Sequence, residues 1–376
     1  MPAVQIRNGR DAAYNGAVTP STPDEEGTRS QDAPGDRPDE AGRKVRFLAS
    51  PSGYPEPVSA VEPVETHFAW VFLTERHAWK MKKAIRAQVI DYRRLEDREY
   101  YCREELRLNR RLADWVYLDV VPLTEDPDGR LHLGGDGRAV DWLVKMRRLP
   151  EDEMLEQLID RGRVGDDQLA RVARHLAEFY ADLAPEPLEA EAYVSRLLAQ
   201  NDEQRRHLEA LDDALADDPW PGILDDQRRY VRAHRQTIGA RAEAGRIVEA
   251  HGDLRPEHVY LGERFAVIDC LEFSRDLRVQ DSAEEVAFLA LECERAGGQN
   301  LRDRLLAAWQ AASADTPVPS LMAYYFSRRA MVRAVLSAWH LEDPSFGREH
   351  YIAEARRYMA LAREFVDEAL ADQDRG

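Results

Sequence analysis

The sequence has few cysteines and no long apolar segment. Only 3 of its 376 residues are cysteine, an odd number whose spacing matches no metal-ligand pattern. We therefore expect reduced thiols and a cytoplasmic protein. No run of about eighteen apolar residues occurs, and the first residues lack the basic and then apolar pattern of a secretory signal. These absences predict a soluble protein with no membrane partner.

Positive charge is also in deficit. Lys and Arg together number 52 and Asp and Glu 70, which gives a net charge of −18. A strongly acidic protein is repelled by nucleic-acid phosphates and by anionic lipid surfaces, so we expect neither as a partner. The same charge is compatible with a cationic small molecule. Nothing in the pattern specifies an oligomeric state.

Composition divides the chain into three parts. Large apolar residues are scarce in residues 1–45, which we expect to be a disordered tail because they cannot offset the entropy of ordering. Residues 46–147 carry strand signals, among them residues 117–123 and 139–146, and are expected to form a lobe with an antiparallel sheet and one helix. Residues 148–376 are helical in pattern, with one of the helices predicted over residues 225–244, apart from one hairpin. The predicted fold class is therefore α+β with two lobes.

The strand-rich part contains a run of lysines at the end of a predicted hairpin. Strands are predicted at residues 68–73 and 78–82. Because side chains alternate along a strand, Lys80 and Lys82 share a face. They could form a solvated strand edge that blocks pairing with other chains, or they could bind phosphate. The spacing alone does not choose between the two lysines.

A helix predicted over residues 94–112 carries a carboxylate on its apolar side. Tyr101, Leu108 and Leu112 form one stripe, and Glu105 lies within it. A buried carboxylate needs a partner. One of the arginines of the same helix, such as Arg98 or Arg110, could be that partner.

The helical part contains one hairpin, and an acid lies at each end of it. In residues 251–273 two short apolar runs flank a turn at residues 262–264. Asp253 precedes the hairpin and Asp269 follows it, so both carboxylates are expected at the same end of a rigid element. Paired acids in this arrangement suit phosphoryl transfer with Mg²⁺.

These motifs resemble the aminoglycoside-phosphotransferase-like kinases, which have the protein-kinase-like fold. The motifs are His251-Gly252-Asp253, Val267-Ile268-Asp269, Lys80-Met81-Lys82-Lys83 and Glu104-Glu105-Leu106-Arg107-Leu108-Asn109-Arg110-Arg111-Leu112. The resemblance covers about residues 47–291 and is nearest to a bacterial group in which some members are fused to a downstream ATP-binding domain. We expect no such domain here, because the sequence ends after the helical part.

The resemblance implies an ATP-dependent phosphotransferase that moves the γ-phosphate to a hydroxyl of a small molecule. Asp253 would be the catalytic base and Asp269 a ligand of Mg²⁺. Lys82 would bind phosphate and Glu105 would orient it. Met146, at the exit of the last strand of the first lobe, would lie where the adenine of ATP binds.

Two departures from the family pattern favour an alternative. His258 stands where the family has an Asn that binds a second metal, and imidazole suits Mn²⁺ better than Mg²⁺. The hairpin at residues 68–82 also lacks the glycine-rich loop of protein kinases. The alternative is a catalytically weak or inactive nucleotide-binding pseudokinase with a regulatory role.

Overall fold

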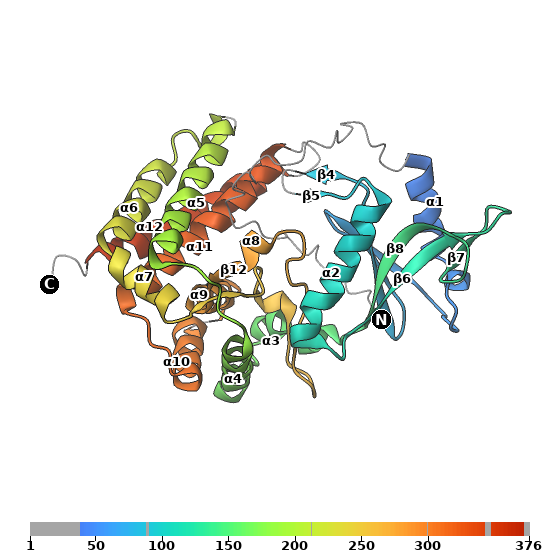
Figure 1. Cartoon of the computed structure of the whole chain (residues 1–376), viewed down its shortest axis with the longest axis horizontal. Helices are drawn as coiled ribbons and strands as arrows, with labels where there is room; N and C mark the ends of the chain where they lie inside the picture. Colours follow the sequence, from blue (N-terminus) through green and yellow to red (C-terminus); the bar gives the residue numbers. More distant parts are fainter. Residues whose placement is uncertain (1–37, 88–89, 212, 299, 343–346, 372–376) are drawn as a thin grey trace. The chain divides into compact units, whose positions relative to one another are not determined.

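The computed structural model describes residues 38–371 apart from 88–89, 212, 299 and 343–346. The described residues divide into two compact units (Figure 1). The first contains residues 38–153 and 260–274, and the second contains residues 154–259 and 275–371. The first unit combines a sheet with helices and the second is largely helical, which confirms the α+β fold class.

The first unit is built on a six-stranded antiparallel sheet in the order β1-β2-β3-β8-β6-β7. Its strands are β1 Glu62–Glu65, β2 Ala69–Leu73, β3 His77–Lys82, β6 Tyr117–Glu125, β7 Leu131–Leu133 and β8 Arg138–Arg147. The helix α2, Leu95–Ala113, packs against β6 and β8, and a small ladder joins β4, Arg86–Ala87, to β5, Ile90–Asp91. The strand β1 was not predicted, because most of its residues are exposed and it shows no apolar alternation.

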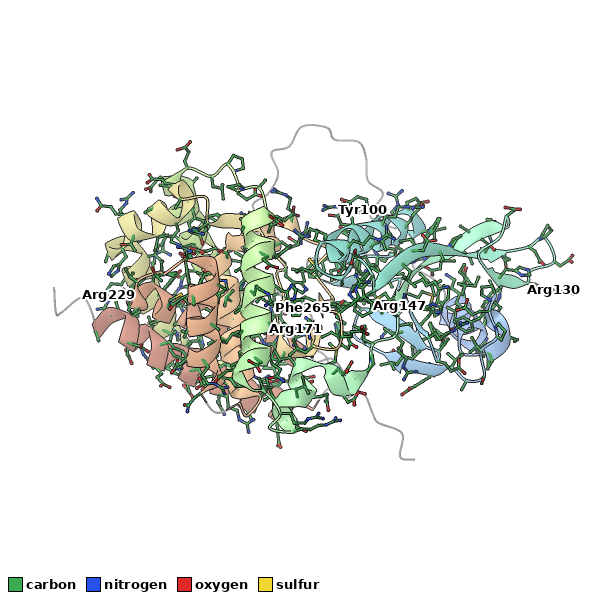
Figure 2. The ribbon with its side chains drawn as sticks, turned by 90° about the horizontal axis from the view of Figure 1, so that it is seen from below. Tyr100, Arg130, Arg147, Arg171, Arg229 and Phe265 are labelled. Atoms are coloured by element: carbon green, nitrogen blue, oxygen red, sulfur yellow. The ribbon has the colours of Figure 1, made fainter. Side chains whose placement is uncertain are left out.

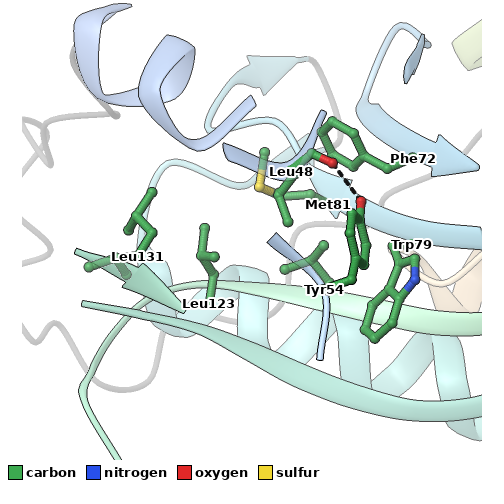
Figure 3. Packing of buried hydrophobic residues seen from close by; sticks show 9 residues of the cluster. Leu48, Tyr54, Phe72, Trp79, Met81, Leu123 and Leu131 are labelled. Carbon is green, nitrogen blue, oxygen red and sulfur yellow. Dashed lines mark hydrogen bonds between the residues drawn. The ribbon is translucent and has the colours of Figure 1, made fainter. Parts of the chain in front are cut away.

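An apolar core lies on one face of this sheet (Figure 3). Trp79 and Met81 of β3 enter it together with Leu48, the last residue of α1, Pro38–Leu48. Tyr54 follows the short helix η1, Pro51–Gly53, and its hydroxyl donates to the carbonyl of Leu48 at 2.6 Å. Because side chains alternate along β3, its two lysines lie on the opposite face, toward α2.

The helix α1 differs from the predicted disordered tail. Residues 1–37 of that tail lie outside the described residues, but residues 38–45 are helical. Lys44 is 1% exposed, and its Nζ lies 3.0 Å from Oδ2 of Asp141 on β8. Arg98 of α2 donates from Nε to Oδ1 of the same carboxylate at 2.8 Å. This partner is about a hundred residues away in sequence, so local composition could not reveal it.

We expect Asp141→Ala to lower the free energy of unfolding by about 3–5 kcal/mol, because the change removes the carboxylate that two buried cations share. Chemical denaturation measures this loss. The matched control is Glu99→Ala, which breaks an exposed pair with Arg103 on α2 and should cost less than about 1 kcal/mol. Equal losses of unfolding free energy in the two variants would show that the buried network contributes no more stability than the exposed pair.

The second unit is helical, with one short ladder. Its helices are α3 Leu155–Asp160, α4 Asp166–Asp182, α5 Ala190–Ala210, α6 Trp220–Ala233, α7 Arg235–Glu243, α8 Arg275–Arg278, α9 Ser282–Arg295, α10 Leu301–Ser313, α11 Pro319–Trp339 and α12 Arg348–Ala371. The helices α11 and α12 pack side by side (Figure 1). The strand β9, Ile247–Glu249, pairs with β12, Val279–Asp281. This ladder was not predicted, because three-residue strands carry too little alternation to be recognised. None of the helices in the described part of the chain combines the length and apolar composition that a membrane span requires.

The predicted hairpin is present as β10, Val259–Tyr260, and β11, Ala266–Val267, and the boundary between the units falls within β10. The sequence pattern predicts that all of residues 251–273 belong to the helical lobe. In the structure, residues 260–274 pack with the first unit, where α2 contacts β11. Trp115 donates from Nε1 to the carbonyl of Phe265 at 3.2 Å, and its ring also lies against Arg147. Phe265 and Arg147 are labelled in Figure 2.

Candidate functional site

In the first unit, Glu105 of α2 is fully buried between the two lysines of β3. Its Oε1 lies 3.0 Å from Nζ of Lys80, and its Oε2 lies 2.7 Å from Nζ of Lys82. The predicted contact between Lys82 and Glu105 is therefore present, and Lys80 shares it. A buried carboxylate is stable only when it is compensated, so the two ammonium groups hold Glu105 in one orientation.

Two acids of the segment after β11 provide further contacts for the lysines. Asp269 Oδ1 lies 2.6 Å from Nζ of Lys80. Glu272 Oε1 contacts Nζ of Lys82 and accepts a hydrogen bond from the Tyr92 hydroxyl at 2.8 Å. The side chains of Lys82 and Glu272 are 2% and 10% exposed, whereas those of Lys80 and Asp269 are 17% and 46% exposed. Lys80 and Asp269 are thus the part of the cluster that solvent reaches.

Hydrogen bonds to the backbone position the segment that carries these acids. The Asp269 amide donates to the Tyr117 hydroxyl at 3.0 Å, and the Cys270 amide donates to Oδ1 of Asn109 at 2.9 Å. Asp269 has a φ of 63°, in the left-handed region that Asp and Asn tolerate better than most residues. Groups on β6 and α2 therefore hold this turn on the sheet.

The alternating charges shift the pKa values of the cluster. Burial lowers the pKa of Lys80, but Asp269 and Glu105 raise it well above its usual value. Burial likewise opposes the charge of Lys82, and Glu105 and Glu272 raise its pKa. Burial raises the pKa of Glu272, but the two lysines lower it, and the lowering prevails. The lysines are therefore cationic and Glu272 anionic at neutral pH.

In the second unit, Glu285 of α9 holds the loop that follows β9. Its carboxylate accepts hydrogen bonds from the amides of His251 at 3.0 Å and Gly252 at 2.6 Å. The hydroxyl of Tyr180 and the amide of Gln280 donate to it as well, each at 2.7 Å. Burial raises the pKa of Glu285 despite these bonds. Gly252 has a φ of 91°, where a side chain would be strained, so glycine suits this turn.

Asp253 follows this turn and is 2% exposed. Its Oδ1 lies 3.0 Å from Nε of Arg255, although the two groups are not aligned as a hydrogen bond. Arg255 also contacts Oε1 of Glu257 at 2.5 Å. Burial lowers the pKa of Arg255, but the two acids raise it. The guanidinium thus compensates two carboxylates of this loop.

The His258 side chain forms a hydrogen bond with the backbone of the same loop. Its Nδ1 lies 2.8 Å from the carbonyl oxygen of Asp253 and 3.9 Å from Oδ2 of that residue. A carbonyl can only accept, so Nδ1 carries the proton and donates it. A metal-binding role would therefore fall to the other ring nitrogen, and it stays a prediction.

By sequence, the chain is 31% identical over 311 residues to uncharacterised proteins of Mycobacterium tuberculosis and Mycobacterium bovis. The match covers 81% of this chain and 59% of those proteins, so the chain spans about three fifths of the length of these curated relatives. No family model matches the sequence.

By structure, the chain is similar to a choline/ethanolamine kinase family protein from Mesorhizobium loti, with a TM-score of 0.51 and 16% identity over 88% of this chain and 98% of that one. It is also similar to choline kinase from Cryptosporidium parvum, with a TM-score of 0.54 and 10% identity over 87% and 97% of the two chains. A third match is spectinomycin phosphotransferase in complex with ADP and spectinomycin, with a TM-score of 0.50 and 11% identity over 86% and 98%. The chain has the protein-kinase-like fold. The fold that the sequence motifs implied is thereby confirmed.

In this kinase-like fold, the predicted site residues fall into two sets. Lys80, Lys82, Glu105 and Asp269 form one cluster in the first unit, as described above. Asp253 and His258 lie in the second unit. Met146 lies on β8, where it pairs in register with Ala78 of β3 and Tyr117 of β6, and it is largely buried.

Sequence reasoning missed Tyr92 and Arg255. Arg255 lies within the His-Gly-Asp-Leu-Arg motif, so its closeness to Asp253 could have been anticipated from spacing. No sequence signal marks Tyr92, because its contact with Glu272 joins segments 180 residues apart.

The kinase-like fold raises the question of a metal. The described residues contain no group of three or more His, Cys, Asp or Glu side chains arranged to hold an ion. Mg²⁺ does not require such a cage, because one or two carboxylates commonly bind it together with substrate phosphates and water. Asp269 fits a ligand of this kind, because its carboxylate side chain is half-exposed, so that water and substrate phosphates could complete the coordination of the ion.

Proposed function

We propose that this protein is an ATP-dependent phosphotransferase that moves the γ-phosphoryl group to a hydroxyl of a small molecule. The observation that carries the proposal is the placement of Lys80 between Glu105 and Asp269. A lysine held by one acid beside a second, half-exposed acid suits a nucleotide whose phosphates need both an ammonium group and a metal ion. Fold alone would not support an activity.

The geometry favours Lys80 over Lys82 as the phosphate-binding lysine. The family resemblance favours Lys82, but that side chain is 2% exposed and lies between Glu105 and Glu272. Lys80 is more exposed and lies beside Asp269. Lys82 therefore serves to hold Glu105, and Glu105 in turn orients Lys80.

Asp253 is the proposed base. Its carboxylate would accept the proton of the acceptor hydroxyl as that oxygen bonds to the γ-phosphorus and the bond to the ADP oxygen breaks. The Arg255 guanidinium, 3.0 Å away, compensates the charge of this buried carboxylate. Asp269 would hold Mg²⁺, which neutralises charge on the phosphates when bound. His258 would add a ring nitrogen, which suits Mn²⁺ better.

The acceptor is proposed to be a small, hydroxyl-bearing molecule. The net charge of −18 favours a cationic acceptor. Two of the similar structures are of choline kinase type, and the third contains spectinomycin.

The test is an ATP-consumption assay with Mg²⁺ or Mn²⁺ across amino alcohols, aminoglycosides and neutral sugars. We expect ADP to form only when one class of acceptor is present, and we expect mass spectrometry to detect the phosphorylated acceptor. The control variant is Asp269→Asn, which should lose this acceptor-dependent turnover. If no acceptor gives turnover and ATP does not shift the melting temperature, the proposal fails.

A second candidate is a nucleotide-binding pseudokinase with a regulatory role. The hydrogen bond from His258 Nδ1 to the loop carbonyl favours it, because this bond gives the ring a structural task where the family places a metal-binding Asn. A melting temperature that ATP raises, without turnover for any metal or acceptor, would favour this candidate.

A further inference from the structure

In the first unit, the charged side chains around Glu105 form a closed chain of alternating sign. The order of contact is Asp269, Lys80, Glu105, Lys82 and Glu272. The two acids at the ends lie three residues apart on one segment, so the backbone after β11 closes the chain into a ring. Neighbours of opposite charge stabilise each other strongly when they are buried, provided that every member is compensated.

Glu272 connects this ring to Tyr92, which lies between β5 and α2. Its Oε1 contacts the Lys82 ammonium and accepts from the Tyr92 hydroxyl. The Lys82 ammonium also lies over the Tyr92 ring, 5.2 Å from its centroid. With its acceptor oxygen already in contact with an ammonium group and a phenol, Glu272 is suited to anchoring rather than to binding a metal.

Tyr92 is itself fixed. Its amide donates to the carbonyl of Ile85 at 2.9 Å, and its carbonyl accepts from Nη1 of Arg98 at 2.9 Å. Arg98 is 1% exposed and forms the buried ion pair with Asp141 described above. A continuous set of buried contacts therefore runs from β8 through α2 to Glu272.

We propose that Glu272 is a positioning residue that holds the Asp269 turn against Lys80. Glu272 does so through its contacts with Lys82 and Tyr92. Lys82 then contacts Glu272 on one side and Glu105 on the other, which leaves Oε1 of Glu105 directed at Lys80. The inference rests on the proposed function for its catalytic consequence, but the tether itself is a property of the fold. Small misplacements of a group that binds phosphate or metal are costly, because catalysis depends on positioning.

The first test concerns the tether and needs no activity. In Glu272→Gln, we expect the amides of Asp269 and Cys270 to exchange hydrogen at least about tenfold faster, because local opening becomes easier. Amides of α12 should be unchanged. The matched control is Glu263→Gln, which removes an exposed carboxylate from the same hairpin. If the two variants exchange alike, or if all amides accelerate equally in Glu272→Gln, the proposal is wrong.

The second test concerns function. Glu272→Gln should lower kcat/KM for ATP by roughly 10–100-fold and raise the Mg²⁺ concentration needed for half-maximal rate, with KM for the acceptor unchanged. Tyr92→Phe should produce a smaller change in the same direction, and it can be measured even if Glu272→Gln folds poorly. Rates that fall with an unchanged Mg²⁺ requirement would overturn the positioning role.

The third test is a double-mutant cycle. If Lys82 and Glu272 act as one unit, Lys82→Met combined with Glu272→Gln should cost less than the sum of the single changes. Strict additivity would contradict the ring. If the parent protein neither binds nor consumes ATP, the proposed function fails, while the exchange experiment still decides whether Glu272 is a tether.

Discussion

Asp253→Asn is expected to lower kcat by roughly two to four orders of magnitude, the range of general acid–base catalysis. The amide keeps the size and shape of the carboxylate but cannot accept the proton of the acceptor hydroxyl. The fold should persist, because Arg255 still contacts Glu257 and the Asp253 carbonyl still accepts from His258. KM for ATP should change little, since Lys80 and Asp269 are untouched. Steady-state kinetics with ATP and the acceptor measure both quantities.

The control for this variant is Asp225→Asn. Asp225 is 69% exposed on α6 and pairs with Arg205, so its replacement should leave kcat and the melting temperature unchanged. Undiminished turnover in a folded Asp253→Asn protein would remove Asp253 from the mechanism. If the protein is a pseudokinase, the parent has no turnover, and neither Asp253→Asn nor Asp225→Asn changes that.

Lys80→Met is expected to lower kcat/KM for ATP by roughly 10²–10³-fold, the scale of losing one charge-stabilising group. Methionine keeps most of the length of the unbranched side chain and removes its charge. Lys82→Met should have the smaller kinetic effect and the larger loss of stability, because it leaves Glu105 and Glu272 buried without the ammonium that they share. Kinetics and thermal denaturation of both variants separate the two roles.

The reverse result would restore the role that sequence reasoning assigned to Lys82. That result is a stable Lys82→Met protein with little activity beside a fully active Lys80→Met protein. Lys83→Met provides the control, because Lys83 directly follows the same strand and pairs with Glu65, whose side chain is 56% exposed. It should match the parent in both measurements.

Much of the fold could be predicted because it depends on short-range patterns. The strands β2, β3, β6 and β8 begin and end within two residues of their predicted bounds, because period-two alternation is read locally. The helix predicted over residues 225–244 is two helices, which meet at His234. Periodicity alone did not reveal this break, because no Pro or Gly marks it.

The candidate site was predictable only in part. Alternation along β3 placed Lys80 and Lys82 on one face, and the position of Glu105 on an apolar stripe predicted that it needs a charged partner. The family resemblance, and not the pattern, implied that this partner is a strand lysine. Spacing could not choose between the lysines, because both lie within reach of one carboxylate. Their exposure and their second partners distinguish them, and both depend on where the segment after β11 packs.

The sequence by itself determined the α+β class, the helix that carries Glu105, the hairpin between Asp253 and Asp269, and the kinase-like resemblance. Each of these features depends on residues that lie close together along the chain. The tertiary structure alone decided that residues 38–45 form a helix held by Asp141, that Glu272 ties its segment to Lys82 and Tyr92, and that Lys80 lies beside Asp269. The physical reason is that burial and charge compensation join groups far apart in sequence. A local pattern shows that a buried charge needs a partner, but only the folded chain shows which partner it has.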